Sequence, residues 1–210
     1  MSTSLKEKAY SIIKERILTG KYESGIMLNE VALSEELGIS RTPIREALND
    51  LEHEMLVKVL PKKGTQVSGI DFEVVRDLFQ VRLLIEPFII LQYGPLIDKQ
   101  ALIRIKQIQQ PAEETGKEAQ FQSDSDLHQL IISSNRNRYL DESIRKVYDQ
   151  NQRIRLMTGE KSESRLIASA AEHIAVIDAL LVEDYPKAAE AMRVHLAASW
   201  KATLDMLYQG

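Results

Sequence analysis

The chain has 210 residues, of which 44% are hydrophobic, with a formal net charge of −4 and no cysteine. This length allows one large domain or two small ones, each with a buried core. The lack of cysteine excludes a disulfide framework and a thiolate metal site, and it suits a reducing cytoplasm. No apolar run approaches the roughly 20 residues that span a bilayer, and the N-terminus lacks the apolar segment of a secretory signal. We therefore expect a cytoplasmic protein with no membrane partner.

The chain changes character near residue 70. Residues 1–70 carry ten Lys and Arg against ten Asp and Glu, whereas residues 71–210 carry seventeen against twenty-one. The first part consists of short segments broken by glycine and proline, and the second of long segments with helical periodicity. We predict two domains, residues 1–70 and 71–210, with Asp71 capping the first helix of the second domain.

The first part predicts a winged helix-turn-helix. One helix begins near Leu5 and ends before Gly20, a short helix ends at Gly38, and a third follows Ser40 as its cap and extends to about His53. The stretch LVKVLPKKGTQVSGI then contains two β-rich runs around a Pro-Lys-Lys-Gly turn, which is typical of a hairpin.

The second part is expected to be a bundle of about six helices, so the whole chain is mainly α. The first of these helices contains Pro87, where it could bend, and the second is interrupted near Pro111. The expected ranges are 71–93, 97–118, 120–134, 137–158, 163–182 and 186–208.

The stretch ISRTPIREAL begins a helix with two chemically different faces. Its core face follows helical spacing and comprises Ile44, Ala47, Leu48 and Leu51. Its outer face carries Arg41, Arg45 and Asn49 in one column, with Thr42 beside it. Arginine can fork O6 and N7 of guanine, asparagine suits adenine, and residues at a helix start can bind a phosphate.

The spacing of two arginines four residues apart would, by itself, indicate only an ordinary solvent-exposed helix face. The order of helices and hairpin around them favours DNA recognition instead. The hairpin tip adds two cations, Lys62 and Lys63, beside Gly64, where the backbone can approach closely.

Residues 28–67 resemble the DNA-binding domain of the GntR family of bacterial transcription regulators, most specifically in the run SRTPIREAL. The resemblance implies base or phosphate contacts from Arg41, Thr42 and Arg45, and wing contacts around Lys63 and Gly64. Some members carry another DNA-contacting arginine where this chain has Val31, which implies a smaller set of contacts.

Three of the four histidines lie in the second part, on three different predicted helices. Asp124 and His128 are four residues apart on one helix face, and His173 and His195 occupy apolar helices that should face the bundle interior. Separate core roles are one interpretation. We favour a shared transition-metal site, for Zn, Ni, Mn, Fe or Co, because each desolvated imidazole would be costly alone. Asp126 is the alternative to Asp124.

Residues 71–210 resemble the FCD ligand-binding domain of a large GntR subfamily, and the short chain is similar to the VanR-type branch. The likeness includes VRLLIEP and Asn137, nine residues after His128. The resemblance implies that the metal ligands are Asp124, His128, His173 and His195.

Four protein ligands leave an octahedral ion two open positions, where a small organic acid could bind as effector and pair with an arginine. The family places an arginine facing the cavity from the first helix of this domain, which indicates Arg82, with Asn137 as a second polar partner. Arg153 and Arg155 are further candidates. Without the resemblance, we would interpret Arg82 as half of an exposed salt bridge with Glu86.

These features predict a ligand-responsive regulator that binds an inverted-repeat operator in double-stranded DNA as a homodimer, and not an enzyme. A constitutive DNA binder with a purely structural metal is one alternative. A metalloenzyme is another, because such a site can activate water. Glu172 would then be a poor base, since it points about a quarter-turn away from His173.

Overall fold

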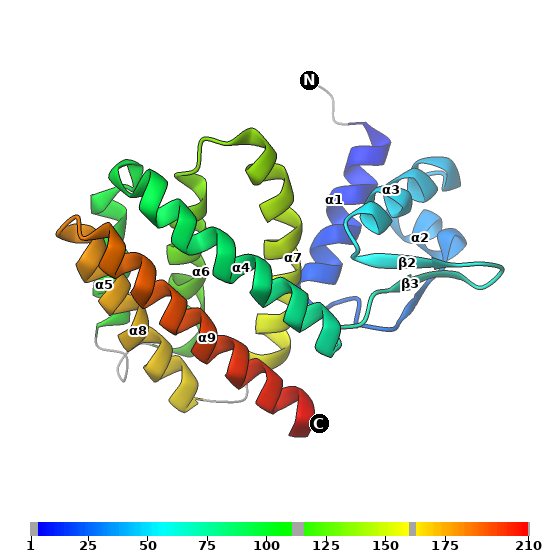
Figure 1. The fold of residues 1–210 in the computed structure, drawn as a ribbon. Coiled ribbons are helices and arrows are strands. Elements are labelled where there is room, and N and C mark those ends of the chain that lie inside the picture. The colour runs from blue at the N-terminus through cyan, green and yellow to red at the C-terminus, as the bar shows by residue number, and fades with distance from the viewer. Residues whose placement is uncertain (1–3, 111–115, 160–162, 210) are drawn as a thin grey trace. The chain divides into compact units, whose positions relative to one another are not determined.

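The computed structural model describes residues 4–110, 116–159 and 163–209. The chain forms two compact units (Figure 1), one containing Met1–Ile70 and Tyr148–Leu156, the other Asp71–Val147 and Met157–Gly210. The predicted domain boundaries place the short segment Tyr148–Leu156 in the second domain, whereas the structure groups it with the first unit. Within the described residues, no helix is both long and apolar enough to cross a lipid bilayer.

The first unit is a winged helix-turn-helix, as predicted. Its elements are α1 (Leu5–Leu18), β1 (Met27–Leu28), α2 (Glu30–Leu37), α3 (Arg41–His53), β2 (Val57–Leu60) and β3 (Gly64–Val67). Strands β2 and β3 form the expected antiparallel hairpin, with Leu60 opposite Gly64. The two-residue strand β1 was not expected; it pairs with β3 and gives the sheet order β1-β3-β2.

Local signals set the ends of α2 and α3. The side chain of Asn29 accepts hydrogen bonds from the backbone N–H groups of Val31 and Ala32, which caps α2. The helix ends at Gly38, whose φ of 63° is the left-handed conformation that favours glycine. Ser40 occupies the N-cap position of α3, but its side chain makes no capping hydrogen bond within the described part of the chain, contrary to expectation.

The core of the first unit lies between α1 and α3. The buried residues of these two helices are Ala9, Ile13, Ile17, Ile44, Ala47, Leu48 and Leu51. Helical spacing also places Leu5 on this face, but Leu5 is exposed because it is the first residue of α1. The segment Tyr148–Leu156 joins this unit through buried Arg153, which donates hydrogen bonds to the hydroxyl of Ser24 and the carbonyl oxygen of Ser68.

The described residues of the second unit form helices joined by short turns and loops, without a strand. Its elements are α4 (Phe72–Tyr93), the 3-10 turn η1 (Gly94–Leu96), α5 (Lys99–Gln109), α6 (Lys117–Ser133), α7 (Arg138–Gly159), α8 (Glu163–Leu181) and α9 (Tyr185–Gln209). Within α7, the segment Tyr148–Leu156 belongs to the first unit. The Asp71 side chain accepts from the Val74 backbone N–H and caps α4, as predicted. Pro87 lies buried inside α4, and the interruption expected near Pro111 falls outside the described residues.

Helices α4 and α9 lie side by side, and α8 packs against α9 (Figure 1). Phe79 of α4 stacks on Trp200 of α9 with ring centroids 6.2 Å apart and the planes 6° from parallel. Gly94, just after α4, allows close approach of Tyr185, because a Cβ at Gly94 would lie 2.3 Å from Tyr185 Cδ1. This packing brings residues of α4, α6, α8 and α9 into one interior.

Candidate metal centre and DNA-reading surface

The outer face of α3 is exposed to solvent, as a recognition helix requires. Arg41, Thr42, Arg45 and Asn49 are all exposed, whereas Ile44, Ala47, Leu48 and Leu51 are buried on the other face. One face of α3 therefore packs in the core and the other presents polar groups to solvent, because the apolar residues recur with the helical period.

The hairpin tip presents its two cations to solvent. Lys62, Lys63 and Gly64 are exposed. Lys62 has a φ of 64° and Gly64 a φ of 107°, and the second value favours glycine because an L side chain rarely adopts it. The structure therefore assigns Gly64 a conformational role in the turn as well as an exposed position.

Glu30, at the first residue of α2, holds both arginines of α3. Its carboxylate accepts hydrogen bonds from Arg45 Nε at 3.0 Å and Arg45 Nη2 at 2.7 Å, with Arg41 Nη2 at 3.5 Å. The hydrogen bond from Arg45 is the main reason that the pKa of the Glu30 carboxyl is lowered. Glu30 could not be identified from the sequence pattern, because its partners lie eleven and fifteen residues along the chain.

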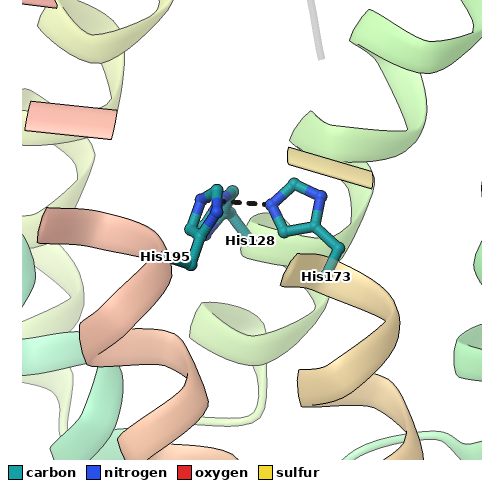
Figure 2. A group of neighbouring side chains, drawn as sticks. All are labelled: His128, His173 and His195. Atoms are coloured by element: carbon teal, nitrogen blue, oxygen red, sulfur yellow. Dashed lines mark hydrogen bonds between the residues drawn. The ribbon is translucent and has the colours of Figure 1, made fainter. Parts of the chain in front are cut away.

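Three imidazoles converge inside the second unit (Figure 2). His128 comes from α6, His173 from α8 and His195 from α9, and all three are buried. Their candidate ligand nitrogens lie within 4.8 Å of one another, and His173 Nε2 is 3.1 Å from His195 Nε2. Two nitrogens that bind one metal ion at about 2.1 Å lie about 3.0–3.4 Å apart, so the spacing of His173 and His195 suits a shared metal ion.

The Asp124 carboxylate lies beside the same imidazoles. Its oxygens are 3.8 Å from His128 Nε2 and 3.7 Å from His173 Nε2, and Ser169 Oγ donates a hydrogen bond to Oδ2. Asp126, the alternative, is exposed and accepts a hydrogen bond from Gln122. The described geometry therefore groups Asp124, and not Asp126, with the histidines.

Each imidazole also has a polar partner at its outer nitrogen. Glu86 Oε2 lies 2.6 Å from His128 Nδ1, and Glu172 Oε2 lies 2.8 Å from His195 Nδ1. The side-chain amide of Gln109 lies at His173 Nδ1, 3.2 Å through Nε2, while its Oε1 is buried without a hydrogen-bond partner in the described residues. Turning the amide over would let Oε1 accept the Nδ1 proton.

This outer ring was not expected from the sequence, although Glu172 adjoins His173 and Glu86 lies four residues after Arg82. An acceptor at Nδ1 fixes the tautomer that leaves Nε2 as a lone-pair donor, which is how metal-binding histidines are usually supported. The same tautomer of His173, with its proton on Nδ1, would give Gln109 Oε1 a hydrogen-bond donor once the amide is turned over.

Burial favours the neutral form of the His195 imidazole. Burial is the largest cause that lowers the pKa of His195, and the Glu172 hydrogen bond opposes it. Burial would raise the pKa of Glu172, but hydrogen bonds from Arg165 and His195 outweigh it and lower that pKa to about 2. Three imidazoles with a carboxylate form a donor set that suits Zn, Ni, Mn, Fe or Co. The residues present therefore fit a divalent transition metal.

Arg82 adjoins this cluster, but it is neither exposed nor unpaired. Its side chain is 3% exposed, and Nε donates to Glu86 Oε1 at 2.7 Å. Its Nη2 lies 3.3 Å from His128 Nδ1. The pairing with Glu86 that the sequence suggested is thus present, but buried, next to the histidines.

Two other residues expected to bind the effector, Asn137 and Arg153, have polar partners outside the cluster. Asn137 is exposed, and its side-chain oxygen accepts from the backbone N–H groups of Tyr139 and Leu140, so it caps α7. Arg153 is held in the first unit by its bonds to Ser24 and Ser68, and Arg155 belongs to the same segment. Because Asn137 and Arg153 are engaged with these other partners, we do not assign either of them to effector binding.

Two family models match the chain. Residues 5–67 match the model described as bacterial regulatory proteins, gntR family, and residues 77–198 match the FCD domain model. Neither model distinguishes the VanR-type branch, which stays a prediction.

Two curated relatives are transcription regulators by name. An HTH-type regulator in an unstable DNA locus of Streptomyces ambofaciens is 28% identical over 191 residues, covering 90% of this chain and 80% of the relative. The HTH-type regulator YdhC of Bacillus subtilis is 26% identical over 148 residues, covering 67% of this chain. The alignment spans 65% of YdhC, slightly less than two thirds of its length.

Solved structures share the fold. A GntR transcriptional regulator from Rhodococcus sp. RHA1 has a TM-score of 0.80 at 18% identity, covering 95% of this chain and 97% of that one. A Zn²⁺-bound FCD domain of another regulator has a TM-score of 0.60 at 24% identity, covering 68% of this chain and 100% of that domain. At these identities, both similarities show a shared fold and no more.

Proposed function

Given that the chain belongs to the GntR family of bacterial regulatory proteins and carries an FCD domain, we propose that this DNA-binding transcription regulator responds to a small carboxylic acid. In this proposal a cytoplasmic homodimer binds an inverted-repeat operator, and each helical domain holds one divalent metal ion. The convergence of three buried imidazoles carries the proposal, because it provides a built site inside the domain expected to sense the effector.

For DNA reading, the exposed column of α3 supports base and phosphate contacts. We assign base contact to Arg45 and Asn49, and phosphate contact to Arg41 and Thr42 near the helix start. The exposed cations of the hairpin tip, Lys62 and Lys63 beside Gly64, would lie on the DNA backbone.

For metal binding, we propose that Asp124, His128, His173 and His195 are the ligands. The short distances among them and the acceptors at the outer nitrogens support this set. A bound metal would supply a cation with open coordination positions for the carboxylate of an acid.

For effector binding, Arg82 is the residue of this chain best placed to pair with an acid. Its guanidinium is already desolvated and oriented by Glu86 beside His128, so an entering carboxylate would meet a prepared cation. Asn137 is left out of this proposal because its side chain caps α7.

For dimer formation, α4 offers an exposed apolar stripe, which we define as Leu84, Phe88 and Leu91. These residues are spaced i, i+4 and i+7 and are 75%, 46% and 40% exposed. A stripe of this kind supports association with a second copy. The acid would then act by binding one arrangement of the dimer more tightly than another, which changes DNA affinity.

Thermal melts in the presence of small carboxylic acids, with and without a chelator, test the sensor. Stabilisation by particular acids only when metal is bound is the expected result, followed by a shift in the affinity for operator DNA. Stabilisation by metal alone would support a constitutive DNA binder with a structural metal. Turnover of an acid would support a metalloenzyme instead.

In His173→Ala, we expect elemental analysis to find no stoichiometric metal.

A further inference from the structure

An acidic side chain lies in the middle of the surface proposed to face DNA. Glu30 lines an open groove of about 370 Å³ together with Arg41 and Arg45 of α3 and with Lys63 and Gly64 of the hairpin. A carboxylate here opposes binding to DNA, because it repels the phosphates.

A role as helix cap does not explain Glu30. Asn29 already accepts hydrogen bonds from two backbone N–H groups at the start of α2. A carboxylate at a helix N-terminus still adds a modest stabilisation through the helix dipole. The question is therefore whether Glu30 acts only on α2 or through its partners on α3.

The geometry of the Glu30–Arg45 pair leaves one edge of the guanidinium available. Arg45 uses Nε and the neighbouring N–H of Nη2 to bind the two carboxylate oxygens. The opposite edge, formed by Nη1 and the second N–H of Nη2, makes no hydrogen bond to any described residue. That edge carries the two parallel donors that can fork O6 and N7 of guanine.

We propose that Glu30 is a specificity-determining residue that orients Arg45 for guanine. The inference rests on the proposed DNA-reading role of Arg45. The carboxylate fixes the plane of the guanidinium before DNA arrives, so less side-chain freedom is lost when the base contact forms. Ordering of one long side chain corresponds to roughly 2- to 12-fold in binding. The same negative charge weakens binding to DNA of any sequence, so Glu30 increases discrimination at the expense of affinity.

The test begins by selecting the preferred sequence of the full-length protein from random duplex DNA. Affinities are then measured for the selected duplex, for duplexes in which each guanine is replaced in turn, and for an unrelated duplex. Arg45→Ala identifies the guanine that Arg45 reads. We expect Glu30→Gln to lower discrimination at that same guanine by roughly 2- to 12-fold. It should tighten binding to unrelated DNA, with the slope of log K against log salt steeper by up to about 1.

Three further variants separate geometry from charge. Glu30→Asp keeps the charge but shortens the side chain, so it should lose guanine discrimination without gaining affinity for unrelated DNA. Glu35→Gln removes one charge from an exposed position of the same helix and should leave discrimination unchanged. In the Arg45→Ala background, Glu30→Gln should cause no additional loss of discrimination, because the two residues act as a unit. Thermal melts identify any variant that fails to fold.

The outcomes separate this inference from the proposed function. The inference is overturned if Glu30→Gln retains full guanine discrimination, if its loss persists without Arg45, or if it tightens specific and unrelated DNA equally. A wild-type protein that selects no sequence would overturn the proposed function, and this inference with it. A protein that selects a sequence but does not use Arg45 for a guanine would overturn only this inference and the assigned role of Arg45.

Discussion

The hydrogen bond from His195 to Glu172 predicts a specific loss of metal affinity in Glu172→Gln. Three donors converge on the Glu172 carboxylate: His195 Nδ1 at 2.8 Å, and Arg165 Nη1 and Nη2 at 2.7 Å each. A glutamine has one acceptor oxygen in place of two, and its amide N–H groups would face at least one of these donors. The variant therefore cannot hold both His195 and Arg165 as the carboxylate does.

The expected size follows from the position of this contact. Loss of the partner outside a metal-binding histidine typically lowers metal affinity about 10- to 100-fold, or about 1.4–2.7 kcal/mol. The ligand His195 itself remains, so binding should weaken and not disappear. We expect the metal-free variant to be less stable as well, since a buried donor that loses its acceptor costs about 1–3 kcal/mol.

Competition with a chromophoric chelator measures the metal affinity directly. The matched control is Glu190→Gln on α9. This substitution also removes one negative charge, but Glu190 is paired with Arg193 on the exposed surface. The measurement should be made below the melting temperature of the metal-free variant, so that unfolding does not contribute. Equal metal affinities for Glu172→Gln, Glu190→Gln and the wild type would refute the role given to Glu172.

Two other changes test packing and assembly. Gly94→Ala should lower stability by about 1–3 kcal/mol and the melting temperature by about 2–4 °C per kcal/mol, because the new Cβ meets the Tyr185 ring. Gly69→Ala, which meets no atom within 4 Å, should melt like the wild type, and equal melts for both variants would contradict the packing argument. Leu84→Glu, within the α4 stripe, should convert a dimer to a monomer in sedimentation experiments. Val182→Glu, equally exposed at 75%, should remain dimeric; a dimeric Leu84→Glu would exclude the stripe as the interface.

Short-range patterns predicted most of the fold. The hairpin followed from two β-rich runs around a turn, and the cap of α4 followed from Asp71. The strand β1 could not be predicted, because two residues show no alternation and become a strand only by pairing with β3. The exposed position of Leu5 also depends on tertiary packing, since helical spacing alone places it on the apolar face.

The candidate metal centre was predictable only in part. Imidazoles on apolar helices indicated an interior position, and the i, i+4 spacing paired Asp124 with His128. The outer partners were not predictable, because Glu86 reaches His128 across 42 residues and Gln109 reaches His173 across 64. The same spacing that suggested a surface salt bridge for Arg82 could not show that the pair is buried.

The stack of Phe79 on Trp200 gives the protein a built-in optical reporter. Trp200 is the single tryptophan of the chain, so selective excitation of indole observes one location. Its aromatic partner Phe79 also carries the Arg82 guanidinium, 5.4 Å from the ring centroid. An acid that draws Arg82 away from Phe79 would change the electrostatic field at the indole. The resulting shift in the emission wavelength would report binding of the acid without an attached dye.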